Sequence, residues 1–297
     1  MTDENFKHRN SKNNKVELEL NKTNLSNVSE AKIKGVDGRF IYKVSDTEKA
    51  MGSVASAKMY NQIGIKTPTV KQIITAKSKD NFLTETIQPD VTKMEKVETC
   101  LAKDDVEYSK IPHGFLGKYK WEIFENLVLR ERMLEFMTPE CLTQLENVFL
   151  VDELRTDPDR TTLNYFLTKA KGSQKYEGVV VIDLENMLLF DYCRNGEKDD
   201  FKNFILYPYS TATPQQNQDV ATYKQRVVDL KELIQSGSLS KDNITVLKNA
   251  LTYDFPKEIK KACKERKLKG KKRSIIVDPV ERLWEYNNNE IGKDLGL

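Results

Sequence analysis

Asp157-Pro-Asp-Arg-Thr-Thr-Leu-Asn164 and, further along the chain, Val179-Val-Val-Ile-Asp183 are the two most informative segments of this 297-residue sequence. The first is polar and loop-like, and it offers a carboxylate at Asp159 and a side-chain amide at Asn164. The second reads as a short buried strand that ends on an acid. A neutral amide oxygen and a carboxylate oxygen are ligands that Mg²⁺ accepts. We therefore expect Asn164 and Asp183 to be metal ligands, with Asp159 placed to accept a hydroxyl proton.

A lysine upstream completes this set of groups. Lys43 lies in the strand-like run Phe40 to Val44, and a cation on a strand can reach the α- and β-phosphates of a nucleotide. A polar turn at 24–29 precedes this strand, so the backbone and hydroxyls of Ser26 and Ser29 are candidate phosphate contacts. The five-residue interval from Asp159 to Asn164 equals the Asp-to-Asn interval of a protein-kinase catalytic loop.

The hydrophobic pattern divides the chain into a β-rich first part and a helical remainder. Residues 1–15 read as a flexible polar arm, and 16–90 read as strands around one helix, which spans Val54–Ile63 before Gly64. Helical periodicity dominates the chain from residue 91 to 297, over 121–136, 139–151, 220–235, 241–251 and 256–267. We predict an α+β fold with a β-rich N-terminal lobe, which binds the nucleotide, and a mainly helical C-terminal lobe.

The expected strands within the first part are short and antiparallel. Alternation from Val16 to Leu20, a run at 31–34 and the run 39–44 after a Gly35–Gly38 turn predict three strands, the last two forming a hairpin. Two further strands are expected at 70–75 and 82–87. The second of these would connect the lobes, with backbone groups of Glu85, Thr86 and Ile87 meeting the adenine edge.

Asp159-Arg160-x-x-x-Asn164 followed by Val181-Ile182-Asp183 resembles the catalytic and metal-binding loops of atypical kinases. The similarity is to HipA-type and CtkA-type bacterial Ser/Thr kinases and to type II phosphatidylinositol 4-kinases, and it spans roughly residues 16–190. It implies a protein-kinase-like fold, ATP and Mg²⁺ as cofactors, and catalytic roles for Asp159, Lys43 and Arg160, the last as an anchor of the loop.

The sequence departs from that family at named places. The family's glutamate on the small-lobe helix would fall near Ser53, and Glu48 is the nearest acidic residue. The turn at 24–29 is not glycine-rich, and the acids after the strand read Asp183-Leu-Glu185 without a glycine. Asp157 is an alternative base to Asp159, and Glu185 is a second candidate metal ligand.

Composition narrows the function classes. Lys and Arg total 48 against 45 Asp and Glu, a net charge of +3, which does not favour a nucleic-acid binder. Two histidines, His8 and His113, and four scattered cysteines do not favour histidine or zinc chemistry. The polar N-terminus lacks a secretory signal and no apolar run is long enough to span a membrane, so we expect a cytoplasmic protein or an effector delivered into a host cell.

Three functions remain open on the sequence. The first is a Ser/Thr protein kinase whose partner is a protein substrate, with its own chain as one such substrate. The second is a phosphoinositide or small-molecule kinase, and the third is a catalytically weak, pseudokinase-like binding module. The basic segment 257–273 is either a solvated helix face or a site for an anionic partner.

Overall fold

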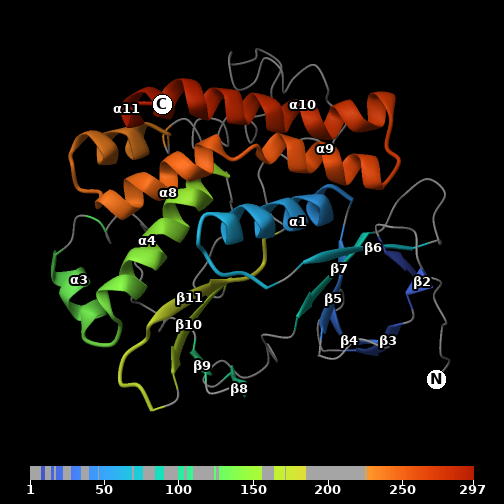
Figure 1. Cartoon of the computed structure of the whole chain (residues 1–297), viewed down its shortest axis with the longest axis horizontal. Helices are drawn as coiled ribbons and strands as arrows, with labels where there is room; N and C mark the ends of the chain where they lie inside the picture. The colour runs from blue at the N-terminus through green and yellow to red at the C-terminus, as the bar shows by residue number, and fades with distance from the viewer. Residues whose placement is uncertain are drawn as a thin grey trace.

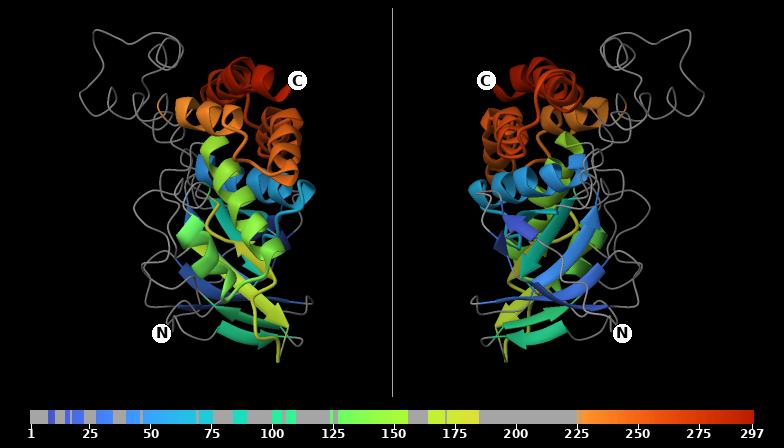
Figure 2. Two further views of the ribbon diagram at one scale, coloured as in Figure 1. Left: turned by 90° about the vertical axis from the view of Figure 1, so that its left-hand side faces the viewer. Right: turned by 90° about the vertical axis from the view of Figure 1, so that its right-hand side faces the viewer.

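The computed structural model describes residues 8–10, 15–16, 18–22, 28–34, 40–45, 47–68, 70–75, 84–89, 100–103, 106–109, 124, 127–155, 164–170, 172–184, 225 and 227–297. Helices and strands both contribute (Figure 1), which confirms that the fold mixes the two. The orange and red helices of the C-terminal part gather on one side of the molecule, and the strands lie on the other side beside the green helices (Figure 2).

Within the described residues, seven strands form the first sheet, in the order β2-β1-β6-β7-β5-β4-β3. They are β1 His8–Asn10, β2 Lys15–Val16, β3 Leu18–Lys22, β4 Val28–Ile33, β5 Phe40–Ser45, β6 Lys71–Thr75 and β7 Thr84–Pro89. The antiparallel pairs β3–β4 and β4–β5 are the three-strand arrangement expected from the alternating pattern. β5 and β7 lie in the middle of this sheet, so both have neighbours on each side.

Strand β1 comes from the stretch that its polarity assigned to a flexible arm. His8, Arg9 and Asn10 pair antiparallel with residues of β6, and β2 pairs with β1 in turn. Backbone pairing to an existing sheet edge requires no apolar side chains, which is why polarity alone did not reveal this strand.

A second sheet has the order β11-β10-β9-β8 among the described strands. Strand β11 (Gly178–Val181) matches the strand expected at 179–183, and β10 (Tyr165–Ala170) begins directly after Asn164. Strands β8 (Cys100–Lys103) and β9 (Val106–Ser109) were not predicted, because each has four residues and a pattern this short does not stand out from its surroundings. Strand β9 completes the sheet by pairing with β10.

Helix α1, Thr47–Gln62, begins seven residues before the start that we expected at Val54, and Gly64, whose φ of 87° suits glycine, follows its end. Its first half, Thr47-Glu-Lys-Ala-Met-Gly-Ser, has no apolar periodicity, so the pattern did not show it. Small residues such as Ala50, Ser53 and Ser56 are fully buried. They let α1 pack closely against β6 and β7 on one side and α9 on the other.

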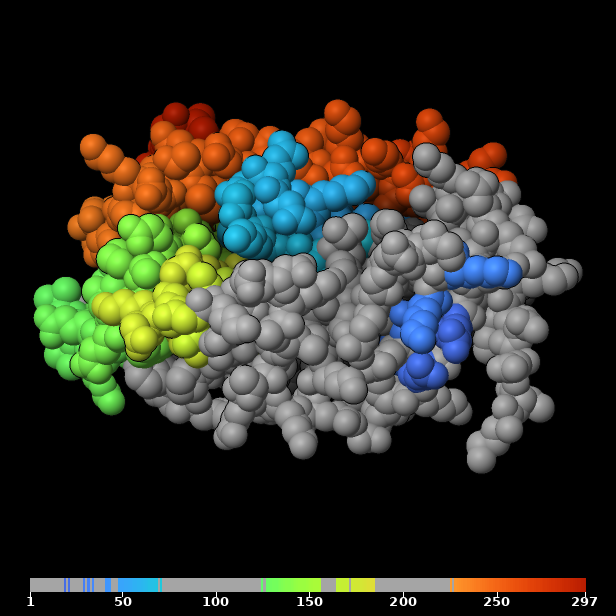
Figure 3. All heavy atoms as spheres, turned by 60° about the horizontal axis from the view of Figure 1, so that its bottom comes forward, coloured from blue at the N-terminus to red at the C-terminus, as the bar shows by residue number. Residues whose placement is uncertain are grey.

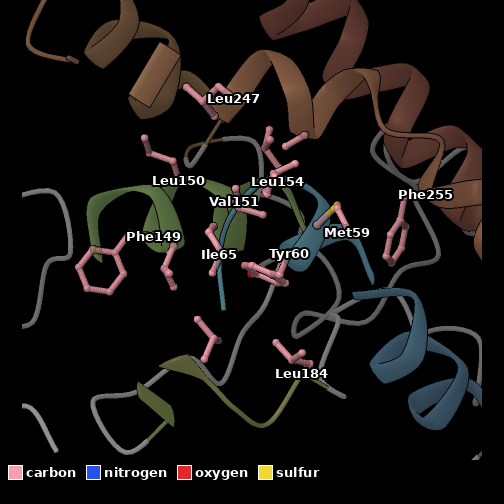
Figure 4. Packing of buried hydrophobic residues seen from close by; sticks show 14 of the residues in the cluster. Met59, Tyr60, Ile65, Phe149, Leu150, Val151, Leu154, Leu184, Leu247 and Phe255 are labelled. Atoms are coloured by element: carbon pink, nitrogen blue, oxygen red, sulfur yellow. The ribbon is translucent and has the colours of Figure 1, made fainter. Parts of the chain in front are cut away.

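Helix α4, Pro139–Leu154, contains the whole range 139–151 in which we expected a helix. Most of its residues are buried. Thr138 caps it by accepting a hydrogen bond from the Cys141 N–H, and Pro139 suits the first turn. Helix α3, Leu127–Leu134, precedes it and covers part of the helix expected at 121–136. Figure 4 shows Phe149, Leu150, Val151 and Leu154 of α4 directed into the core.

The C-terminal part consists of helices: 227–235, α8 (Lys241–Thr252), α9 (Phe255–Glu265), α10 (Gly270–Asn287), the π-helical turn Asn288–Gly292 and α11 (Lys293–Leu295). Helix α10 was not predicted, because Pro279 lies inside it and a basic run opens it. It is nevertheless anchored in the core: Trp284 stacks on Phe255 of α9 with ring centroids 4.9 Å apart. Trp284 is buried, with 4% relative exposure.

One cluster of buried apolar side chains joins α1, α4, β10, β11 and the C-terminal helices. Met51 and Tyr60 of α1 belong to it together with Leu247 of α8 and Phe255 of α9. The helix of the β-rich first part therefore shares its core with the helical remainder. No described helix is long and apolar enough to cross a membrane.

Candidate nucleotide and metal site

Lys43 lies in the centre of the first sheet. In the register of the strands it is opposite Val28 at the start of β4 and opposite Thr86 of β7. Val28 directly follows the connection between β3 and β4, where the phosphate turn was expected. Lys43 is thus on the strand next to the segment that we predicted to hold the phosphates.

The Lys43 Nζ atom forms an ion pair with the Asp183 carboxylate across 140 positions of sequence. The two side chains are largely shielded, with relative exposures of 13% and 22%. Asp183 lies two residues after the end of β11, and Lys43 lies in β5. The ion pair therefore joins the first sheet to the second. The structure therefore brings together the cation and one of the carboxylates that the sequence singled out.

The pairing of β10 with β11 brings Asn164 beside the same turn. Tyr165 is opposite Val181, and the Ile182 N–H donates to the Asn164 carbonyl at 3.0 Å. Asn164 is buried, with 7% relative exposure. Asn164 and Asp183 therefore lie at the same end of neighbouring antiparallel strands, although 19 positions of sequence separate them.

Asp183 has an unusual backbone conformation, with a φ of 57°. The left-handed region costs a non-glycine residue roughly 1–2 kcal/mol, although aspartate and asparagine tolerate it better than most. Such a conformation persists where the surroundings fix it, and it is common at functional sites. The hydrogen bond from Ile182 to Asn164 on one side is one such constraint.

The oxygens of Asn164 and Asp183 fit the requirements of Mg²⁺. This ion takes oxygen ligands, and in phosphotransferases it usually binds one or two carboxylates together with substrate phosphates. Within the described ranges no three His, Cys, Asp or Glu side chains form a metal-binding cluster.

The chain that follows α1 borders this site. Lys66 forms a parallel bridge with Val180 of β11, and the Val181 N–H donates to the Lys66 carbonyl at 2.9 Å. Figure 3 shows α1 and the residues after it, in light blue, next to the yellow surface of the β10–β11 region. This contact fixes β11 relative to α1, and so fixes Asp183 relative to the first sheet.

Several predicted residues lie outside the described residues, and their roles remain predictions. These are Asp159, Arg160, Asp157, Glu185 and Ser26. Ser29 is described, and it lies in β4 opposite Lys22 and Tyr42 rather than in a turn. The turn predicted at 24–29 is thus shorter than expected, because β4 already begins at Val28.

Glu85, Thr86 and Ile87 were expected at the end of a strand, where their backbone would meet adenine. The structure instead places them inside β7, where each is opposite a residue of β5 and a residue of β6. In an antiparallel sheet, alternate residues bond to opposite neighbours, so a central strand uses its backbone groups within the sheet. The strand continues to Pro89, and this is why the connection begins later than its apolar pattern indicated.

Glu48 lies in the first turn of α1, and its charge acts on Arg266 and Cys263 of α9. Burial lowers the pKa of Arg266 to about 10, and the charge of Glu48 opposes that shift. Ser53, where the family's glutamate was expected, is fully buried, and its hydroxyl has no hydrogen-bond partner among the described atoms. The partner of Lys43 that the structure shows is Asp183.

The basic segment 257–273 covers α9 and the start of α10. Lys257, Lys261 and Lys264 are exposed, whereas Arg266 is buried. Lys260 forms an ion pair with Glu281 of α10. This distribution is that of a solvated helix face with one buried arginine, and an anionic partner stays a prediction.

Sequence reasoning missed a buried polar cluster behind the Asp183 turn. It contains Tyr60 of α1, Asp152 of α4, Arg155 directly after α4, and Tyr165 of β10. Asp152 and Arg155 stand in Phe149-Leu-Val-Asp-Glu-Leu-Arg155, at the end of an otherwise apolar helix. Charged residues in such a context were the signal that could have identified the cluster.

Comparison with known proteins places this geometry in a fold. The chain is similar to the crystal structure of CtkA, a Helicobacter pylori proinflammatory kinase, with a TM-score of 0.53 and 13% sequence identity. The similarity covers 94% of each chain, so it extends over both sheets and the C-terminal helices. No protein family and no curated protein matches the sequence. The overall fold is therefore kinase-like.

Proposed function

We propose that this protein is an ATP- and Mg²⁺-dependent phosphotransferase that phosphorylates serine or threonine hydroxyls of a protein, its own chain included. The observation that carries the proposal is the ion pair between Lys43 and Asp183. Phosphoryl transfer needs a cation at the phosphates and an acidic metal ligand at the same place. Here a lysine of a central strand and an acid at the end of β11 meet within a kinase-like fold.

Each group has a proposed task. The Lys43 ammonium binds the α- and β-phosphates, and Asn164 and Asp183 supply oxygens for Mg²⁺. The metal, when bound, neutralises charge on the phosphates. Asp159 orients the acceptor hydroxyl and takes its proton, while Arg160 anchors the loop.

The remaining nucleotide contacts follow from the strand register. Backbone amides and hydroxyls of the β3–β4 connection, Ser26 among them, contact the phosphates. Because Glu85, Thr86 and Ile87 are paired on both sides within β7, we expect the adenine edge to meet the chain after Pro89. A two-lobe arrangement, with the nucleotide between the lobes, is part of this proposal.

The test is incubation of the purified chain with γ-labelled ATP and Mg²⁺, with and without a generic Ser/Thr protein substrate. Label on serine or threonine of either protein is the expected result. Parallel reactions contain phosphoinositide vesicles, and label confined to the lipid would replace the protein acceptor by a lipid one. The absence of transfer in all reactions, with nucleotide binding retained, would refute the phosphotransferase proposal.

A nucleotide-binding module without transfer is the second candidate. The observation that favours it is Ser53, which is buried on α1 where kinases of this family carry the acid that holds the lysine. In a module of this kind, the chain would bind ATP analogues without turnover. Equilibrium binding, measured beside the labelling reaction, separates the two functions.

A further inference from the structure

The polar cluster behind the Asp183 turn is buried, and its contacts converge on a single backbone carbonyl. Asp152 and Arg155 are fully buried. One guanidinium nitrogen of Arg155 donates to the Tyr60 hydroxyl at 3.1 Å, and the other donates to the Leu184 carbonyl at 2.9 Å. Leu184 directly follows Asp183, so the guanidinium holds the turn that carries the proposed metal ligand.

The Arg155 guanidinium is itself held in place. Its Nη1 atom lies 3.6 Å from Asp152 Oδ1, and its carbon lies 5.2 Å from the centre of the Tyr60 ring. The Tyr60 hydroxyl donates to one oxygen of Asp152, and the Tyr165 hydroxyl donates to the other at 3.0 Å. A planar guanidinium in such surroundings has one orientation, and this orientation is directed at Leu184.

This arrangement fixes both sides of a conformation that aspartate rarely adopts. The Ile182 N–H bonds to the Asn164 carbonyl before Asp183, and Arg155 bonds to the Leu184 carbonyl after it. Between these two hydrogen bonds, Asp183 has its φ of 57°. Backbone in this region persists where neighbouring contacts determine it, and these two contacts are on adjacent residues.

The cluster also connects the turn to α1. Tyr60 comes from the helix that packs against β6 and β7, whereas Arg155 follows α4. Figure 4 shows Tyr60 in the middle of the core, with Leu154 of α4 and Leu184 around it. A buried ion pair of this kind often gives no net stability compared with apolar residues, so stability alone is a weak reason for it.

We propose that Arg155 is a positioning residue, which, through Tyr60, keeps the Asp183 turn in the conformation that binds the metal. The proposal rests on the proposed function, since it assumes that Asp183 is a ligand of Mg²⁺ bound with a nucleotide. Arg155 touches neither substrate nor metal in this scheme. It acts through the Leu184 carbonyl on the direction of the neighbouring carboxylate.

The test compares two conservative variants, Tyr60→Phe and Tyr165→Phe. Each removes a hydroxyl that donates to Asp152, but the Tyr60 hydroxyl also accepts a hydrogen bond from Arg155. Arg155→Ala would leave Asp152 buried without this cation and can fail to fold, so it is not the main test. Affinity for an ATP analogue is measured over a Mg²⁺ series and without Mg²⁺, beside thermal unfolding of each variant.

Tyr60→Phe should raise the Mg²⁺ concentration for half-maximal binding roughly tenfold, as changes behind a metal ligand do, without altering metal-free affinity. Tyr165→Phe should leave the Mg²⁺ dependence unchanged even if its unfolding temperature falls equally. An unchanged Mg²⁺ dependence in Tyr60→Phe, or equal shifts in the two variants, would overturn the positioning role and leave the proposed function intact. A wild-type chain whose nucleotide binding does not respond to Mg²⁺ would overturn both.

Discussion

At the scale of single residues, Asp183 combines a shielded ion pair with a left-handed backbone. These two properties have different requirements. The ion pair needs a carboxylate, whereas the φ of 57° needs a residue that tolerates the left-handed region. Asparagine tolerates this region but carries no charge. This difference makes it possible to separate the charge of the side chain from the conformation of the turn.

Asp183→Asn should therefore retain the fold and lose phosphoryl transfer. Loss of a charged group that stabilises the transition state typically lowers the rate by about 10²–10³-fold, and a metal ligand contributes through such stabilisation. Asp183→Ala should lose activity as well, and should additionally be less stable than Asp183→Asn because alanine tolerates the turn less well. Initial rates and thermal unfolding are the two measurements. Full activity in Asp183→Ala, which offers the metal no side-chain oxygen, would exclude this residue as a metal ligand.

Lys43→Ala should weaken nucleotide binding and turnover. Charged hydrogen bonds contribute about 1.5–3 kcal/mol, and a contact from Lys43 to phosphates should therefore be worth roughly 10–150-fold in affinity. Lys58→Ala is the matched control, since Lys58 of α1 also forms an ion pair, with Glu258 of α9 at 2.6 Å. Titration with an ATP analogue measures both, and equal affinities for Lys43→Ala and the control would remove Lys43 from the site.

At the scale of elements, the early start of α1 determines which residues Glu48 meets. Because the helix begins at Thr47, Glu48 is in its first turn, where an acid favours the helix dipole. Its charge acts on Arg266 and Cys263 of α9. Helix α1 packs between the first sheet and α9, so its start contributes to the contact of α1 with α9.

Glu48→Ala should consequently lower stability more than nucleotide affinity. Without Glu48 the pKa of buried Arg266, already lowered to about 10, should fall further, since an opposing charge is removed. We expect a loss of about 1 kcal/mol in the free energy of unfolding, as for a typical substitution, with unchanged affinity for an ATP analogue. Chemical denaturation and nucleotide titration test this, with Glu258→Ala as the control on the surface of α9. A large loss of nucleotide affinity in Glu48→Ala would make Glu48 the partner that holds Lys43 in the bound state.

At the scale of the whole molecule, the core that joins α1 to the C-terminal helices also encloses two thiols. Cys141 of α4 and Cys263 of α9 are fully buried, and the Cys263 sulfur lies 3.8 Å from the Met51 sulfur of α1. Burial raises the pKa of Cys141 to about 12 and that of Cys263 to about 11. Both thiols therefore report on the opening of the core at different places.

Neither cysteine should react with an alkylating reagent at pH 8 while the chain is folded. The thiolate is the reactive form, and at pH 8 a thiol with a pKa of 11 or more is less than about 0.1% ionised. Because the pKa values are raised in the folded state, the thiols favour folding below about pH 9 and this contribution is lost as the pH rises through 11 to 12. Pulsed alkylation with mass spectrometry along a denaturant series should label both in one transition. Labelling of Cys263 well before Cys141 would show that α9 separates from the core before α4 does.

The sequence predicted much of the candidate site because residue types and local secondary structure can be inferred from short stretches of sequence. Lys43 on a strand, a polar loop ending at Asn164 and an apolar strand leading to Asp183 follow from residue type, spacing and alternation. The main helices α4, α8 and α9 follow in the same way, since each has a capping residue, α8 and α9 have an apolar face, and α4 is rich in apolar residues throughout. Such features depend on neighbours only a few residues away.

The tertiary structure decided what depends on residues distant in sequence. Segments far apart in the chain are joined by the ion pair of Lys43 with Asp183 and by the hydrogen bonds of Arg155. The pairing of β1 with β6 and of β7 with β5 joins distant segments as well. Helix α10 forms in spite of Pro279 because Trp284 and its neighbours are buried against α9. Local patterns indicate whether a segment prefers helix or strand. Which segments pack together depends on burial and long-range pairing, because contacts between distant segments supply most of the free energy that stabilises the fold.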